Sequence, residues 1–150
     1  MHALTKECKV AAFANYVAAG VDGAVVNGTA IDTEGFDAIS VALKLGAIGA
    51  EAGAVAFKLQ HSLTTVDGDF VDITGAVNNI ASTVNADAQK MLVIEVKDLT
   101  KRYVRTVYQR TAQNTGIDAG IALLYGARKT PVTQSTGVKA AVFVAGAVNA

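Results

Sequence analysis

The most regular alternation of apolar and polar residues lies in residues 53–75. Val55, Phe57 and Leu59 alternate there with smaller or more polar side chains, which is the period of two expected of a strand with one buried face. Asp, Ser and Gly residues that favour turns follow at residues 62–69. The pattern predicts a β-hairpin. Because an isolated apolar hairpin is unstable in water, we expect it to pack against another sheet or helix.

The second strand of this hairpin is expected at residues 70–74. Its alternation places Val71 and Ile73 on one face, and we expect the strand to stop at Gly75. A similar alternation in residues 36–45 predicts another strand. The buried face of that strand is expected to hold Ile39, Val41, Leu43 and Leu45.

Four further segments have strand character. Residues 29–32 and 91–97 are short apolar runs, and residues 102–111 carry bulk on both faces, which is typical of a central or interfacial strand. The fourth segment, residues 117–125, is expected to align Ile117, Ile121, Leu123 and Tyr125 in one row.

The other segments are less regular. Residues 9–17 fit either a strand or a helical turn, and residues 76–90 are expected to form a loop. About eight or nine short strands, with turn signals at intervals of roughly 8 to 12 residues, predict an all-β sandwich, barrel or jelly roll. We expect one domain at residues 1–131 and a C-terminal extension at residues 132–150, which adds an edge strand to its own sheet or to that of a neighbouring chain.

Composition adds a preference for assembly. Hydrophobic residues make up 51% of the chain, but aromatic residues only 6%, so small aliphatic side chains dominate and additional burial against partners is favoured. Thirteen basic and thirteen acidic residues give a net charge of zero, which is unlike a general nucleic-acid binder. The single Cys8 cannot form an intramolecular disulfide, and no apolar run is long enough to predict a membrane span.

The polar turn of the hairpin contains residue types found in catalytic and metal sites. His61 and Ser62, with Asp67 or Asp69, supply the side chains of a hydrolase triad, but one hairpin provides them all, whereas triad members normally come from separate elements. Asp67, Asp69 and Asp72 are oxygen ligands of the kind that Ca²⁺ prefers, without the spacing of a complete calcium loop. Turn formation is the favoured interpretation of both sets.

Basic residues concentrate in the last third of the chain, beside tyrosines. Arginine and tyrosine are frequent anchors of protein interfaces. The alternative is a solvated sheet face with ordinary surface ion pairs. The basic residues are Lys101, Arg102, Arg105, Arg110, Arg128 and Lys129.

Two segments of this region carry a resemblance to a known family. At residues 101–105 (KRYVR) and 124–132 (LYGARKTPV), the chain resembles the capsid cement or decoration proteins, which are small structural head proteins of tailed bacteriophages. The resemblance covers residues 29–132 and includes the hairpin segment FKLQHSLTTVDGDFVDITGA. The chain has Phe70 where the family pattern more often has tryptophan. We expect this difference to alter the packing of the hairpin but not the class of protein.

The resemblance implies a jelly roll or related β-sandwich of about eight strands with an extended C-terminal tail. It implies a non-enzymatic virion protein, made in the cytoplasm of a bacterial host, that forms a homodimer or trimer and clamps major capsid subunits from the capsid surface. No cofactor, metal, catalytic residue, nucleic acid or membrane partner is expected. The candidate contact residues are Lys101, Arg102, Tyr103, Arg105, Arg110, Arg128, Lys129, Val142, Phe143 and Val144.

Two other functions remain as alternatives. One is a different virion part, such as a head-completion or tail-tube protein, which also needs sheets that pair between chains. The other is a carbohydrate-binding β-sandwich with its site at residues 62–69. The absence of tryptophan, the usual stacking platform for a sugar ring, counts against it.

Overall fold

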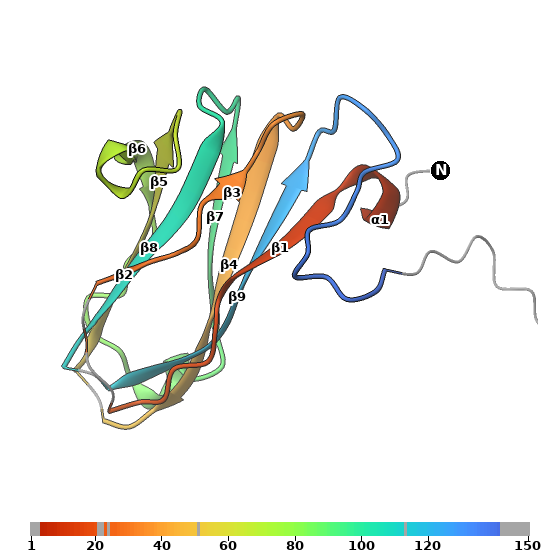
Figure 1. Cartoon of the computed structure of the whole chain (residues 1–150). Helices are drawn as coiled ribbons and strands as arrows, with labels where there is room; N and C mark the ends of the chain where they lie inside the picture. Colours follow the sequence, from red (N-terminus) through yellow and green to blue (C-terminus); the bar gives the residue numbers. More distant parts are fainter. Residues whose placement is uncertain (1–3, 21–22, 24, 51, 113, 142–150) are drawn as a thin grey trace, which may run out of the picture.

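Two antiparallel sheets pack face to face in the computed structural model, which describes residues 4–20, 23, 25–50, 52–112 and 114–141 (Figure 1). The predicted all-β sandwich is confirmed. The first sheet has the order β1 (Lys9–Ala14), β9 (Thr115–Tyr125), β4 (Ala38–Ile48), β7 (Met91–Lys97). The second has the order β2 (Val26–Asn27), β8 (Tyr103–Thr111), β5 (Ala54–Ser62), β6 (Val71–Val77), and β3 (Ile31–Asp32) also pairs with β8.

In the part of the chain that the structure describes, helical structure is limited to single turns. They are α1 (Leu4–Glu7) and the 3₁₀ turns η1 (Asp67–Asp69) and η2 (Asn85–Asp87). Among the described residues, no helix is long and apolar enough to cross a membrane.

The strands pair as one nested hairpin. The predicted hairpin is the innermost pair, β5 with β6, and β4 with β7 encloses it. The broken strand β2/β3 pairs with β8 outside these, and β1 with β9 is the outermost pair. Successive pairs lie in alternate sheets, so the segment between β4 and β5, residues 49–53, crosses from the first sheet to the second.

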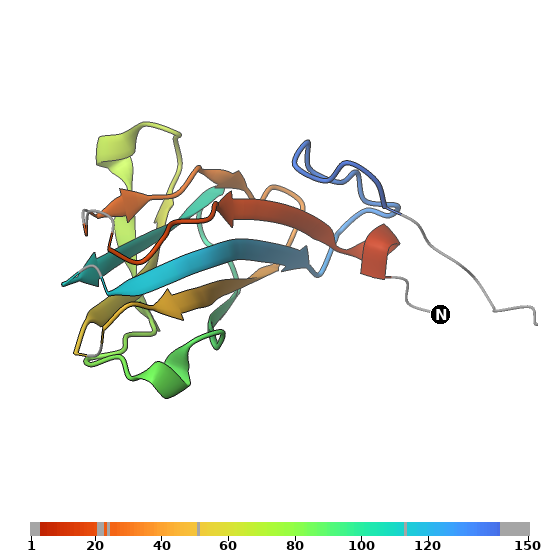
Figure 2. The same ribbon diagram turned by 90° about the horizontal axis from the view of Figure 1, so that it is seen from below.

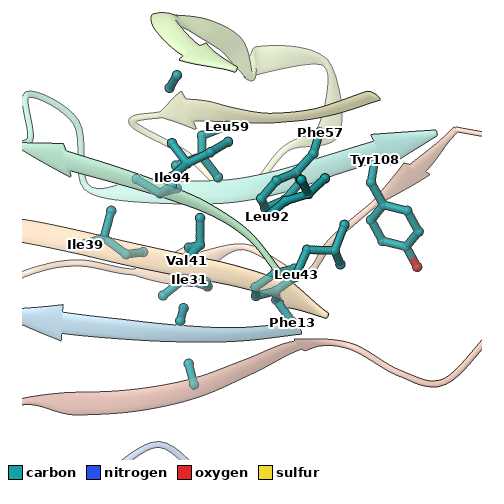
Figure 3. Packing of buried hydrophobic residues seen from close by; sticks show 14 of the residues in the cluster. Phe13, Ile31, Ile39, Val41, Leu43, Phe57, Leu59, Leu92, Ile94 and Tyr108 are labelled. Carbon is teal, nitrogen blue, oxygen red and sulfur yellow. The ribbon is translucent and has the colours of Figure 1, made fainter. Parts of the chain in front are cut away.

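The core fills the space between the two sheets (Figure 3). The predicted inward row of β4, from Ile39 to Leu45, is confirmed, because all four alternate side chains are fully buried. The inward row of β5 is confirmed in the same way. Its Phe57 ring stacks on Phe13 of β1 with the ring centroids 6.2 Å apart, so the aromatic pair joins the two sheets.

The predicted end of β6 is wrong, and its predicted inward face is confirmed only at Ile73, which packs against the core. The strand continues through Gly75 to Val77, and Val71 is 48% exposed, whereas Ala76 is buried. The pairing with β5 is interrupted between Lys58 and Gln60, and Gly75 has a φ of +82°. This irregularity changes the phase of the alternation, so the pattern of a regular strand does not apply.

The predicted row of β9 is confirmed for Ile121, Leu123 and Tyr125, which share the outer face, but is wrong for Ile117. Ile117 is buried, but Ile121 is 52% exposed. The register with β4 skips Asp118, which is the extra residue of a β-bulge. The bulge shifts the alternation by one position, so Ala122 and Leu124 point into the core instead.

Two further strand predictions agree with the structure, and the predicted loop agrees in part. The strand β8 is central, because it lies between β5 and the β2/β3 edge and buries side chains on both faces. Residues 9–14 of the ambiguous N-terminal segment form a strand, β1. The predicted loop at residues 76–90 holds the last residues of β6 and the turn η2, but is otherwise irregular.

Candidate functional site

The basic residues of the predicted contact surface do not all lie together. Arg105 and Arg110 lie on opposite faces of β8, and they are only 7% and 3% exposed. Arg102 immediately precedes β8, whereas Arg110 lies near the other end of this strand. The sequence therefore predicted one cluster, and the structure divides it into three places.

Arg105 holds the turn of the β5–β6 hairpin against the second sheet. Its Nε donates to Gln60 Oε1 at 2.8 Å, and Nη1 forms an ion pair with Asp67. The guanidinium also lies 4.3 Å from the centre of the Phe70 ring. These contacts occupy the side chain within the chain, so its main role here is to position residues 62–70.

Arg110 lies between the sheets at the opposite end of the sandwich. Its Nη1 donates to the carbonyl oxygens of Thr115 at 2.7 Å and Ala18 at 3.1 Å. These bonds tie β8 to the start of β9 and to the segment after β1. A buried guanidinium with such partners supports the fold and offers little surface to another molecule.

Four of the predicted residues converge at one end of the sandwich, where residues 33–37, 98–102 and 126–131 meet at the top of Figure 1. One hollow of about 210 Å³ has both Arg102 and Arg128 in its wall. We call this surface the basic end. Its basic side chains are Lys101, Arg102, Arg128 and Lys129.

Acidic side chains fix the two arginines of the basic end. Arg102 donates to Asp32 through Nε and Nη2, at 3.1 and 2.8 Å, and Nη2 also lies 2.8 Å from Glu34. The bond from Arg102 lowers the pKa of Asp32. Arg128 donates through Nε to Asp37 at 3.0 Å. Because the side chains of Arg102 and Arg128 are still 45% and 70% exposed, both remain accessible while held in place.

The rest of the basic end carries further accessible groups. Lys129 is exposed and Lys101 half-buried, and the Arg102 guanidinium lies 5.3 Å from the centre of the Tyr103 ring. Phe36 and Leu99 line the hollow beside them. The surface therefore combines fixed guanidinium groups, ammonium groups and apolar contacts, a mixture suited to a protein partner with acidic side chains.

The first residues of the predicted C-terminal extension lie along the free edge of β1. The Gln134 amide donates to the Cys8 carbonyl at 2.6 Å and accepts from the Val10 N–H at 2.8 Å, as a neighbouring strand would. Ser135 donates to the Val10 carbonyl. Residues 138–141 form no strand. Three predicted contacts, Val142, Phe143 and Val144, lie outside the described residues, and their role stays a prediction.

The candidate triad and cation ligands are engaged separately. Ser62 is buried and accepts a hydrogen bond from the Thr64 N–H at 3.0 Å, whereas Asp67 pairs with Arg105. Asp69 accepts from Thr64, and Asp72 accepts from the Lys58 ammonium at 2.8 Å. No group of three or more metal-binding side chains occurs among the described residues. Ser62 and Asp67 are thus each bonded to a residue outside the candidate triad.

A groove of about 530 Å³ crosses the outer face of the second sheet. Its wall contains Asn27, Lys58, Gln60 and Arg105, but no aromatic residue. Gln60 and Lys58 both bond Asp72, so the polar groups of the groove largely satisfy one another. The groove therefore offers no stacking platform to a sugar.

The acidic residues that fix the basic end were missed by sequence reasoning. Asp32, Glu34 and Asp37 lie within six residues of one another in the sequence, before β4. That acidic run was a usable signal, because a basic cluster elsewhere in the chain needs counter-charges.

Comparison with family models and with curated proteins finds no match for this chain.

His61 gives the fold a testable dependence on pH. Burial, and secondarily the charge of Lys101, lower the pKa of His61 from its usual 6.5. The unfolded chain therefore binds a proton more readily than the folded chain, and we expect the free energy of unfolding to fall as the pH drops below about 6.5. The measurement is denaturant titration at several pH values between about 7.5 and 5, a range that brackets the usual pKa of histidine. The free energy of unfolding should fall less over this range for His61→Gln than for the unaltered chain. An equal fall in both proteins would contradict the assignment.

Proposed function

We propose that this chain is a structural virion protein that binds the outside of a tailed-bacteriophage head and stabilises it by holding neighbouring major capsid subunits. The observation that carries the proposal is the convergence at the basic end. The segments KRYVR and LYGARKTPV, which resemble capsid cement proteins, are separated in the sequence but meet around residues 33–37. A shared surface is what a common binding function requires of two distant motifs.

The strand connections support this proposal. Four nested antiparallel pairs, folded so that successive pairs lie in alternate sheets, correspond to a jelly roll of eight strands when β2 and β3 are counted as one broken strand. We propose this finer description of the sandwich. Jelly rolls are frequent among virus capsid proteins, although a fold by itself does not define a function.

The chemistry of the basic end suits a capsid surface. Arg102 and Arg128 are held by carboxylates on one side and remain exposed on the other, so little side-chain entropy is lost when they bind. A capsid repeats the same acidic or polar site many times. An oligomer that engages several sites gains avidity, so each contact can be weak. This requirement fits a surface without a deep pocket.

The test is a change of charge at the basic end. We expect the double variant Lys101→Glu/Lys129→Glu to lose at least tenfold in affinity for capsids stripped of accessory proteins, because two attractive contacts become repulsive; a tenfold loss corresponds to about 1.4 kcal/mol. The assay is co-sedimentation with the capsids at several protein concentrations.

The matched control is Lys90→Glu. Lys90 is also exposed, but it precedes β7 at the opposite end of the sandwich. This variant should bind as the unaltered chain does. Equal binding by all three proteins would refute the basic end as the contact surface. A free-energy loss for Lys90→Glu that is half that of the double variant or more would show that binding depends on overall charge alone, because the control changes half as many charges.

A further inference from the structure

The outer faces of the two sheets differ in character. On the second sheet, polar side chains bond one another, as in the contacts among Lys58, Gln60 and Asp72. This is the usual state of an antiparallel sheet that faces water. On the first sheet, Val93 of the edge strand β7 is 49% exposed and Ile121 of the inner strand β9 is 52% exposed. The second sheet also carries an exposed valine, Val77, but it lines a groove with polar residues. What distinguishes the first sheet is that its exposed apolar side chains share one row across the strands.

The strand registers place these residues in one row. Ala12 of β1 is opposite Ile121 of β9, which is opposite Ala42 of β4, which is opposite Val93 of β7. Across the sheet the side chains are thus small, large, small and large. In the neighbouring row, Leu123 of β9 is likewise large where it adjoins the small Ser40 of β4. In the row of Ile121 the ridges are on β9 and β7 and the shallow grooves on β1 and β4, whereas in neighbouring rows Val10 of β1 and Lys44 of β4 are large. The strands β1, β9 and β4 lie side by side in Figure 2.

Two charged groups at the margins of this face, Lys44 and Glu95, are already bonded to neighbouring side chains. The Lys44 ammonium contacts Asp118 at 2.5 Å. Glu95 accepts a hydrogen bond from the Tyr125 hydroxyl, which raises the pKa of Tyr125 to about 12. The row itself contains no charged side chain. Covering it therefore takes no unpaired charge out of water, and the cost of desolvation is low.

We propose that the outer face of the first sheet is an interface between two copies of this chain, related by a two-fold axis that runs parallel to the strands between β9 and β4. This axis places β9 of each copy opposite β4 of the other and β1 opposite β7. Ile121 of one copy then packs over Ala42 of the other, and Val93 packs over Ala12. The two sheets stack at a distance of about 10 Å, as in the core of a sandwich.

A second copy is the occupant because the relief of the face is its own complement. A row that is small, large, small and large across four strands becomes large, small, large and small after this rotation, so each ridge of this row meets a groove, and in the next row Leu123 meets Ser40. Charge agrees with this, because the chain has a net charge of zero and two copies do not repel each other strongly. The inference goes beyond the proposed function and is measured on the isolated protein, so it can fail or succeed independently of capsid binding.

Sedimentation velocity on the purified full chain tests the proposal. We expect the unaltered chain to sediment as a dimer, and Ile121→Lys and Ala42→Lys each to sediment as monomers, since both place a charge in the row. Val77→Lys is the matched control. Val77 is 50% exposed, but it belongs to β6 of the second sheet, so this variant should remain a dimer. Circular dichroism confirms that each variant is folded.

A cross-linking experiment tests the position of the axis. Ala12 and Val93 lie at opposite edges of the first sheet, three strand spacings or roughly 14 Å apart within one chain. The double variant Ala12→Cys/Val93→Cys, treated with a thiol-specific bismaleimide that spans about the 10 Å between stacked sheets, should give covalent dimers. Each single variant should give few. A monomeric or trimeric unaltered chain, dissociation of the Val77→Lys control, or cross-linking that is equal in single and double variants would overturn the proposal.

Discussion

Replacing Phe57 by alanine is expected to lower the free energy of unfolding by about 3 to 5 kcal/mol. Phe57 is fully buried at the middle of β5, and its ring stacks on Phe13 from the other sheet. Alanine would leave a cavity between the sheets and would remove the aromatic contact that joins them. Because a domain is stable by only about 5 to 15 kcal/mol, this single change takes a large share of the total. Urea titration followed by circular dichroism measures the difference.

The control for this prediction is Leu63→Ala. Leu63 is 69% exposed in the turn after β5, so its truncation should change the free energy of unfolding by less than about 0.5 kcal/mol. A loss below about 1 kcal/mol for Phe57→Ala would contradict the tight packing of the two sheets at this position.

The second large effect is expected at Gly120, where β9 pairs with Ala14 of β1. A Cβ atom added there would lie 2.4 Å from Cε2 of Phe13 and 2.7 Å from Cβ of Ala14. Gly120→Ala must therefore displace Phe13 or separate β1 from β9, and we expect it to cost about 1 to 3 kcal/mol. Thermal unfolding should show a lower melting temperature for the variant.

Gly68 provides the matched control for Gly120. It lies in the turn η1 with no atom within 4 Å of an added Cβ, so Gly68→Ala should leave stability nearly unchanged. If Gly120→Ala were as stable as Gly68→Ala, the close approach of β1 to β9 would be incorrect.

The fold was predictable wherever alternation alone decides which side chains are buried. In β4 and β5 the strands are regular over the predicted rows, so Leu43 and Phe57 point inward as expected. Prediction failed in parts of β6 and β9, where Gly75 and the bulge at Asp118 change the phase. A bulge is a property of the pairing between two strands. The sequence of one strand therefore does not reveal its position.

The candidate site was predictable in part for a similar reason. The segments that meet at the basic end were visible as motifs, but the sequence did not separate Arg102 and Arg128 from Arg105 and Arg110. Both faces of β8 are covered, one by the opposite sheet and the other by residues 62–70, so its arginines are buried. That covering is a tertiary property. The acidic run at residues 32–37 is the signal that would have indicated where the exposed arginines are held.

Co-sedimentation of the unaltered chain with phage capsids stripped of accessory proteins tests the central claim most directly. The proposed function assigns the chain to a tailed phage, and the heads used are those of that phage. The bound protein is measured against the major capsid subunit over a range of concentrations. We expect binding to saturate at a fixed ratio to that subunit, with the capsids resisting heat or low salt better afterwards, because each bound oligomer links neighbouring subunits. A chain that stays in the supernatant at every concentration would contradict the proposed function.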